Sequence, residues 1–335
     1  MEELEMKQYK IVIDTKGSDK GAEMMIKGAK LALDKYPELA VLLVGDTDVM
    51  SAECEKLGMP ADRVELLEAP DVITNYDSPA EALFTKRDSS LVKALEALSE
   101  RDDLVGLINA GSTGALIAGS MRYLSGKDRV RPALAAILPA ANGGFTCLVD
   151  TGATIDCPAS TLVHFARLGR DFMKDLYRIE SPRVGLLSNG KEPTKGNKVV
   201  KETHALLRDA EDINFVGNIE GNNALSGDCD VLVCDGFAGN QVLKVTEGAA
   251  TRIITDIVKY SKKTGDESLM KLVGYLMGIY DFNSLGGGVI LGTVKPVIKA
   301  HGAANEQSIV STAGIILNLA ENKELFDKSA FDIKE

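Results

Sequence analysis

The sequence predicts an α/β protein with three layers, in which helices cover both faces of a largely parallel sheet. Short apolar runs of strand length alternate with helical stretches along most of the chain, which is typical of repeated β-α-β units. The length of 335 residues exceeds the size at which a single core usually stops growing. No low-complexity linker divides the chain, so we expect one domain, 1–335, with interleaved lobes.

The first part of the chain supplies four strands. The buried run Tyr9–Asp14 predicts a strand, and a glycine turn leads from it into a helix over 22–36. Apolar runs predict further strands at 40–45, 63–68 and 104–109, and helical patterns are seen at 49–58, 89–100 and 111–123. The stretch 89–100 has the clearest amphipathic pattern of these helices.

The second part continues the same alternation. Short apolar runs predict strands at 135–138, 146–150, 183–187, 213–217 and 230–234. A helical pattern follows at 245–264, and residues 269–280 contain nine apolar residues in twelve. Near the end, Ile298-Lys-Ala-His-Gly302 is read as a strand that ends in His-Gly.

Composition and charge exclude several classes of partner. Hydrophobic residues make up 45% and charged residues 26%, the balance of an ordinary globular protein. Tryptophan is absent and the net charge is -11, so neither a stacking platform for single strands nor a duplex-binding surface is expected, and nucleic acid is not a predicted partner. The first 110 residues carry a net charge of -10, whereas residues 251–300 carry +3.

Cysteine usage and the N-terminal segment indicate the cytoplasm. Five scattered cysteines without a CxxC pair argue for reduced thiols. The start, MEELEMKQYK, lacks the pattern of a signal peptide, and no apolar run reaches the ~18 residues that a membrane span needs. The three histidines lie far apart, so neither a metal nor another cofactor is expected.

Five predicted strands run into glycine-rich polar turns, and strand ends of this kind carry functional residues in parallel sheets. The turns cover 14–19, 109–114, 150–156, 188–197 and 234–240. Backbone N–H groups at the start of a helix suit phosphate or an oxyanion, so the turns together predict a phosphate-containing ligand in an α/β enzyme.

Each turn also has a purely structural interpretation. Ser112 and Thr113 can offer hydroxyls to an anion, or Thr113 can simply cap the following helix. Asn240 can donate from its amide, with Lys244 one helical turn further on, or it can be a helix cap. Lys195 in its glycine turn can act as a point charge, or it is an exposed loop lysine.

Three other residues have reactive side chains at suggestive places. His301 beside Gly302 suits a general acid or base. The pair Asp150 and Asp156 could hold a cation, but these carboxylates fit better as groups that orient neighbouring donors. Cys157 could be an activated nucleophile at a helix start or a small buried residue.

Motifs in matching order and spacing over residues 9–315 resemble the phosphate acyltransferase family of bacterial phospholipid synthesis, the PlsX family. The matching segments are Ser78-Pro-Ala-Glu-Ala, Lys86-Arg-Asp-Ser-Ser90, Ala110-Gly-Ser-Thr-Gly-Ala115, Arg131-Pro-Ala-Leu, Asp150-Thr-Gly-Ala-Thr-Ile-Asp156, Arg183-Val-Gly-Leu-Leu187, Lys195-Gly-Asn197, Asn214-Phe-Val-Gly-Asn-Ile-Glu-Gly221, Val233-Cys-Asp-Gly-Phe-Ala-Gly-Asn-Gln-Val-Leu-Lys244 and Lys299-Ala-His-Gly302.

The resemblance implies a fold related to phosphotransacetylases and isocitrate-type dehydrogenases, and a homodimer associated peripherally with the membrane. It also implies transfer of a fatty acyl group from acyl carrier protein to inorganic phosphate, which gives an acyl phosphate for phospholipid synthesis. Lys195, His301 and Asn240 are then the expected catalytic residues. The expected substrate- and phosphate-binding residues are Asp14, Gly111, Ser112, Thr113, Gly114, Asp150, Asp156, Asn197, Asp235, Gly236 and Lys244.

The sequence departs from the family pattern around this expected site. The first loop usually reads Asp-Ala-Met-Gly-Gly-Asp and here is Asp14-Thr-Lys-Gly-Ser-Asp19; Ser112 stands for an Asn; and the loop before Lys195 is altered. A paralogue that handles short acyl or acetyl phosphates, similar to component C of glycine reductase, is an alternative. The absence of a cysteine after Cys234 counts against that paralogue. A dehydrogenase is less favoured, because no GxGxxG follows the first strand.

Residues 245–282 are expected to form a projecting helical hairpin. Basic residues around its apolar side, such as Arg252 and Lys259, favour contact of residues 253–280 with anionic lipid or an acidic carrier protein. The alternative is a helix pair packed in the core of a dimer.

Overall fold

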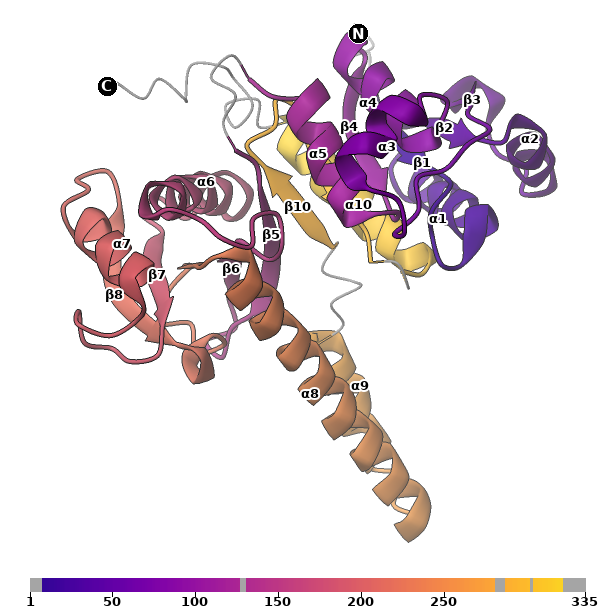
Figure 1. The fold of residues 1–335 in the computed structure, drawn as a ribbon. Coiled ribbons are helices and arrows are strands. Elements are labelled where there is room, and N and C mark those ends of the chain that lie inside the picture. The colour runs from indigo at the N-terminus through magenta and orange to yellow at the C-terminus, as the bar shows by residue number, and fades with distance from the viewer. Residues whose placement is uncertain (1–7, 127–130, 281–286, 302–303, 322–335) are drawn as a thin grey trace, which may run out of the picture. The chain divides into compact units, whose positions relative to one another are not determined.

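The computed structural model describes residues 8–126, 131–280, 287–301 and 304–321. The chain divides into two compact units: residues 1–132 with 283–335 form the first, and residues 133–282 form the second. Strands and helices alternate in both units (Figure 1), which confirms the α/β class predicted from the sequence.

Among its described residues, the first unit contains six strands, in the order β3-β2-β1-β4-β11-β10. Neighbouring strands are parallel, except that β10 and β11 are antiparallel. The strands are β1 (Tyr9–Asp14), β2 (Leu39–Gly45), β3 (Val64–Glu68), β4 (Leu104–Asn109), β10 (Gly288–Leu291) and β11 (Val297–Lys299).

The strand order of this unit reverses direction between β1 and β4. The chain moves from β1 outward to β2 and β3, then returns to place β4 on the other side of β1. In open α/β sheets, ligands bind outside the carboxyl ends of the strands at such a switch point. Asp14 ends β1 and Asn109 ends β4, so these two residues mark the expected place.

Helices of the first unit pack in two groups, as expected when both faces of a sheet are covered. One group contains α1 (Gly21–Lys35), α2 (Thr47–Lys56) and α10 (Glu306–Glu321); the other contains α3 (Pro79–Thr85), α4 (Ser90–Glu100) and α5 (Thr113–Tyr123). Gly106 lets α10 approach β4 closely, because a Cβ there would lie 2.5 Å from Ile316. A short 3-10 turn, Ala61–Arg63, precedes β3.

The second unit contains five strands, in the order β5-β6-β9-β7-β8. Only β5 and β6 pair in antiparallel fashion; the other neighbours are parallel. The strands are β5 (Ala133–Pro139), β6 (Phe145–Val149), β7 (Arg183–Ser188), β8 (Asn214–Glu220) and β9 (Val231–Val233), with a 3-10 turn at Gly221–Asn223.

Two helices cover opposite faces of these strands. A Cβ on Gly169 of α6 (Ala159–Tyr177) would touch Val149 and Val231. The first turns of α8 (Gly236–Thr264) instead pack on the cluster that contains Leu148 and Leu232. Because side chains alternate between the faces of a strand, α6 and α8 lie on different sides. Helix α7 (Lys198–Arg208) packs against α6, β7 and β8.

Helices α8 and α9 (Leu269–Tyr280) lie side by side and extend beyond the strands of the second unit (Figure 1). Gly265 ends α8 with a φ of 73°, a left-handed conformation that glycine adopts without strain. The hairpin exposes large apolar side chains at Val245, Ile253, Tyr260, Met270, Leu272, Tyr275 and Met277. Within the described residues, no helix is long and apolar enough to cross a membrane.

Most predicted elements agree with the structure to within a few residues, but three boundaries differ. Helix α8 begins at Gly236 rather than at 245, because the carboxylate of Asp235 caps it. Strand β11 ends at Lys299, so His301 follows the strand instead of ending it. Ser112, rather than Thr113, occupies the N-cap position of α5. Residues 281–282 of the predicted hairpin, and Gly302, lie outside the described residues.

Candidate active site

In the first unit, a buried carboxylate joins the ends of β1 and β4. The Asn109 Nδ2 donates to Asp14 Oδ2 at 2.7 Å, and the backbone N–H of Lys16 donates to Asp14 Oδ1 at 2.9 Å. The Ser90 hydroxyl, at the start of α4, also hydrogen-bonds this carboxylate. Asn109 Oδ1 in turn accepts from the backbone N–H of Gly111 at 2.9 Å. Asp14 therefore sets the start of the loop 109–114 through Asn109.

Burial raises the pKa of Asp14 to about 6, although its hydrogen bonds act in the opposite direction. Its side chain is 1% exposed, and one of its oxygens accepts from the Asn109 amide. The expectation that Asp14 binds phosphate stays a prediction; in the structure the carboxylate orients this donor amide.

Two glycines allow the loops of this unit to touch. Gly17 has a φ of 81°, and a Cβ there would lie 2.8 Å from the Gly111 Cα. A Cβ on Gly114 would lie 2.9 Å from Pro79, at the start of α3. The matched motif at 110–115 is consequently packed against the turn 14–19 and against the matched motif at 78–82.

The start of α5 is an open helix N-terminus. Ser112 occupies the N-cap position, but its side chain makes no capping hydrogen bond. Among the described residues, no group accepts from the backbone N–H groups of Thr113, Gly114 and Ala115. Unpaired N–H groups at a helix start bind anions through hydrogen bonds and through the helix dipole.

A lysine that the sequence reasoning missed stands beside this helix start. Strand β11 pairs with β4 so that Lys299 lies opposite Asn109. The Lys299 ammonium donates to the carbonyl oxygens of Ala110 at 3.1 Å and Ala300 at 2.5 Å. His301 is exposed two residues later, on the same carboxyl side of the strands. The signal was available in the matched Lys299-Ala-His-Gly302.

In the second unit, the Asp150 carboxylate organises the loop that follows β6. Its oxygens accept from the backbone N–H groups of Leu134 at 2.9 Å, Ala153 at 3.0 Å and Thr154 at 2.6 Å, and more weakly from Gly152 at 3.3 Å. Burial raises the pKa of Asp150, whereas these four hydrogen bonds lower it. Asp150 thus orients the loop, as expected, and Asp156 lies exposed near the end of the loop.

The start of α8 is closed, in contrast to that of α5. The Asp235 carboxylate accepts from the Ala238 N–H at 2.7 Å, and the Thr154 carbonyl accepts from the Gly236 N–H at 2.8 Å. The idea that Asn240 caps this helix is wrong, because Asp235 already does so. Asn240 Nδ2 instead donates to the Thr151 carbonyl at 3.2 Å. An amide carries two N–H donors, so Asn240 can still donate to a ligand.

Lys195 lies exposed in the loop between β7 and α7. Its backbone N–H donates to the Glu192 carbonyl at 3.0 Å, and its aliphatic chain passes close to Gly190, where a Cβ would lie 2.6 Å from the Lys195 Cγ. Asn189 Oδ1 accepts from the Gly196 N–H at 2.8 Å. Asn197 caps α7 by accepting from the Val200 N–H, so its side chain is engaged in structure.

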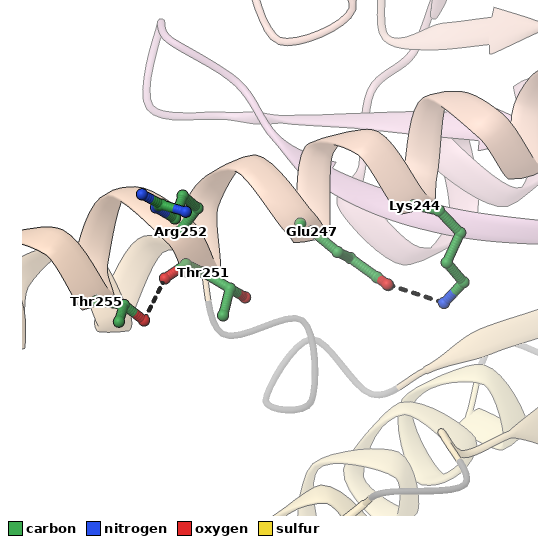
Figure 2. Close-up of a pocket in the computed structure, with 6 residues that line it drawn as sticks. Lys244, Glu247, Thr251, Arg252 and Thr255 are labelled. Carbon is green, nitrogen blue, oxygen red and sulfur yellow. Dashed lines mark hydrogen bonds and ion pairs between the residues drawn. The ribbon is translucent and has the colours of Figure 1, made fainter.

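Lys244 does not join the other predicted residues of this unit. It forms an ion pair with Glu247 at 2.8 Å on the surface of α8. Figure 2 shows it at one end of a shallow hollow of about 480 Å³ along the helix. The hollow is lined by Lys244, Glu247, Gly248, Thr251, Arg252 and Thr255.

Neither unit holds a group of three or more His, Cys, Asp or Glu side chains suited to a metal, within the described part of the chain. Four of the five cysteines are buried. Burial raises the pKa of the Cys147, Cys229 and Cys234 thiols, which disfavours the thiolate form.

Comparison with known proteins shows the family to which this chain belongs. Residues 9–322 match the family model described as fatty acid synthesis protein. The chain belongs to this family. It is 41% identical over 312 residues to the phosphate acyltransferase of Halothermothrix orenii, covering 90% of this chain and 91% of the relative. The phosphate acyltransferase of Clostridium novyi is 36% identical, covering 93% and 95%.

Solved structures support the fold. The EutD phosphotransacetylase from Staphylococcus aureus superposes with a TM-score of 0.61 at 15% identity, covering 94% of this chain and 96% of that one. A phosphotransacetylase from Streptococcus pyogenes gives a TM-score of 0.60 at 14% identity, covering 94% of each chain. The phosphotransacetylase-like fold implied by the sequence resemblance is therefore confirmed.

The raised pKa of Asp14 predicts a pH-dependent stability. Its folded value of about 6 lies above the ordinary 3.8, so the folded state binds more protons between these values. Stability contributed by Asp14 is therefore present at low pH and is lost as the pH rises through 6. At 1.36 kcal/mol per pKa unit, the free energy of unfolding of the wild type should fall by ~2–3 kcal/mol relative to Asp14→Asn between about pH 4 and pH 7.5.

Urea denaturation of both proteins across this pH range measures the difference. A gap between wild type and Asp14→Asn that stays constant with pH would show that the carboxyl does not titrate as described. Asp156→Asn removes one exposed carboxylate from the other unit and is the matched control for the loss of a negative charge.

Proposed function

We propose that this protein transfers an acyl group from a thioester to inorganic phosphate, giving an acyl phosphate and a free thiol. Membership of the fatty acid synthesis protein family supports the proposal, as do relatives called phosphate acyltransferase that match nine-tenths or more of the chain. The observation that carries it in the structure is the uncapped start of α5 beside the Lys299 ammonium.

Inorganic phosphate is the anion proposed for this helix start. The free N–H groups of Thr113, Gly114 and Ala115 would donate to its oxygens, and the Ser112 and Thr113 hydroxyls could add further hydrogen bonds. The positive charge of Lys299 favours the same anion. Gly111 carries no side chain, so it places no Cβ in front of these groups where the loop passes Gly17.

The reaction requires positioning and charge stabilisation more than a covalent intermediate. A phosphate oxygen attacks the thioester carbonyl carbon, and negative charge develops on the carbonyl oxygen. When the C–O double bond re-forms, the C–S bond breaks and the sulfur leaves as a thiolate, which takes up a proton. We assign the proton to His301, stabilisation of phosphate or the developing oxyanion to Lys195, and a further N–H donor to Asn240.

Direct attack by phosphate agrees with the state of the cysteines. A covalent acyl-cysteine would need a reactive thiolate, and the Cys234 thiol is buried with its pKa raised well above the ordinary value. Cys157 is also buried, at 8% exposure, despite its place before α6. The small buried residue is the better interpretation of Cys157.

Long-chain acyl carrier protein is the proposed thioester donor, with phospholipid synthesis as the use of the product. The acidic carrier protein suits the basic residues on the hairpin, which include Lys259, Lys262, Lys263 and Lys271, all exposed. A short-chain acyl donor is the alternative, because the loop before Lys195 departs from the family pattern.

Membrane contact and dimer formation are also proposed for the hairpin. Exposed apolar side chains such as Leu272 and Tyr275 next to lysines form the pattern of a surface that enters a lipid interface. The same apolar side chains could pack against a second copy of the chain. We propose peripheral attachment to an anionic membrane ahead of dimer formation. We also propose that the protein is located in the cytoplasm.

A thioester assay tests the function. Purified protein is incubated with long-chain acyl-[acyl carrier protein] or with acetyl-coenzyme A, with and without phosphate, and free thiol is measured. Phosphate-dependent thiol release from the long-chain substrate is the expected result. Release only from acetyl-coenzyme A would favour the short-chain alternative, and no phosphate dependence would exclude both.

Ser112→Asp should separate helix stability from phosphate binding. An aspartate at the N-cap would accept from the open N–H groups and stabilise α5 by ~0.5–2 kcal/mol. The same carboxylate would repel phosphate, so the KM for phosphate should rise ~10-fold or more in the thioester assay. Ser112→Asn, a neutral cap, is the matched control and should bind phosphate far better than Ser112→Asp. Equal KM values for the two variants would remove phosphate from this helix start.

Flotation with anionic vesicles tests the membrane contact. Wild type should float with vesicles at low salt, and Leu272→Glu/Tyr275→Glu should not, because charges on the exposed apolar side oppose insertion. Leu31→Glu/Val49→Glu places the same charges at exposed apolar positions of the first unit and should still float. If the hairpin variant floats like wild type, the membrane contact is wrong. If it instead becomes monomeric while wild type is dimeric, the dimer interpretation holds.

A further inference from the structure

Strand β8 contains a bulge that changes which side chains face α7. The pairing with β7 advances from Val184–Phe215 to Gly185–Gly217, so Val216 is the extra residue. Gly217 has a φ of 97°, a conformation open to glycine. An extra residue shifts the alternation of side chains by one, which turns Phe215 and Asn218 toward the same face.

Both side chains meet the same histidine on α7. His204 Nδ1 lies 3.0 Å from Asn218 Oδ1, and the His204 ring contacts the Phe215 ring edge-on, with centroids 5.0 Å apart. His204 is 8% exposed and Asn218 is 5% exposed. The bulge turns the Asn218 amide toward the buried His204. Because a buried amide must have its hydrogen bonds satisfied, this pairing is specific.

The Asn218 amide connects this histidine to the Lys195 loop. Asn218 Nδ2 donates to the Glu192 carbonyl at 2.9 Å, and the same carbonyl accepts from the Lys195 N–H at 3.0 Å. A carbonyl can only accept, so the NH₂ of Asn218 must face Glu192 and its oxygen must face His204. His204 Nδ1 consequently carries the hydrogen and donates it to Asn218.

We infer that His204 and Asn218 are positioning residues for Lys195. Asn218 tethers the turn 192–195 to β8, and His204 fixes the orientation of the Asn218 amide. Without the histidine donor the amide could rotate by half a turn, which would set its oxygen against the Glu192 carbonyl. The inference rests on the proposed function where it concerns activity, because Lys195 is assigned there to the reacting anion.

Amide hydrogen exchange tests the tether without reference to activity. Asn218→Leu should speed exchange in the segment 190–196 by ~10-fold, because the turn loses its hydrogen bond to β8, and His204→Phe should do so to a smaller extent. In an Asn218→Leu background, His204→Phe should add nothing to exchange in this segment. Phe215→Leu is the matched control: it removes packing against His204, leaves the hydrogen bonds in place and should not change exchange at 190–196.

Activity then tests the consequence for Lys195. Lys195→Ala alone should lower kcat/KM by ~10²–10³, as for the loss of one electrostatic donor, whereas Lys191→Ala in the same loop should not. Asn218→Leu should lower kcat/KM ~10-fold in the wild-type background and have no further effect with Lys195→Ala. A general loss of stability would instead reduce both backgrounds alike.

Different results would contradict the tether and the link from the tether to catalysis. Unchanged exchange at 190–196 in Asn218→Leu and His204→Phe would overturn the tether, whatever the activity. Faster exchange with full activity in Asn218→Leu, while Lys195→Ala is impaired, would overturn the link from tether to catalysis. Full activity in Lys195→Ala would remove Lys195 from the proposed function and leave the tether to be judged by exchange alone.

Discussion

The candidate residues of both units depend on the same interaction. In each unit, a buried carboxylate at the end of a parallel strand accepts hydrogen bonds from backbone N–H groups. Asp150 accepts four such groups after β6, and Asp14 accepts the Lys16 N–H and the Asn109 amide after β1. A strand that ends in a sharp turn leaves N–H groups without partners, and a buried carboxylate satisfies several of them at once. Burial disfavours the charged form of each carboxylate, whereas these hydrogen bonds favour it. A buried carboxylate at such a position therefore requires enough hydrogen-bond donors from the loop.

The helix starts that carry the candidate residues differ: α7 and α8 have side-chain caps, and α5 does not. Asp235 caps α8 and Asn197 caps α7, so the N–H groups that these side chains accept are not available to a ligand. Helix α5 has a serine at the N-cap that makes no capping bond, an omission that costs about 1 kcal/mol of helix stability. Glycines on either side keep side chains away from that start. Open N–H groups held in this way are usable by an anion at no further cost in reorganisation.

Apolar periodicity predicted most of the strands, because a buried parallel strand must be apolar along its length, but β10 was not predicted. It also placed Asp14 and Asn109 at strand ends. The sequence could not show that these two strands are neighbours, since β4 follows β1 by about 90 residues and pairs with it only after the chain returns. The role of Lys299 depends on the register of β11 against β4 and was therefore missed. The sequence left open whether Asn240 donates to a ligand or caps the helix, because only the geometry shows that Asp235 occupies the cap.

The bulge in β8 shows how one glycine can affect a loop in another part of the sequence. In a regular strand, Phe215 and Asn218 would point to opposite faces, and α7 could contact only one of them. Gly217 accommodates the extra residue, so His204 receives an aromatic neighbour and an amide acceptor together. The imidazole orients the amide that reaches the Glu192 carbonyl, and the aromatic ring packs edge-on against the imidazole. A local irregularity in pairing thereby connects β8 to an exposed loop, in line with the use of bulges to re-aim side chains.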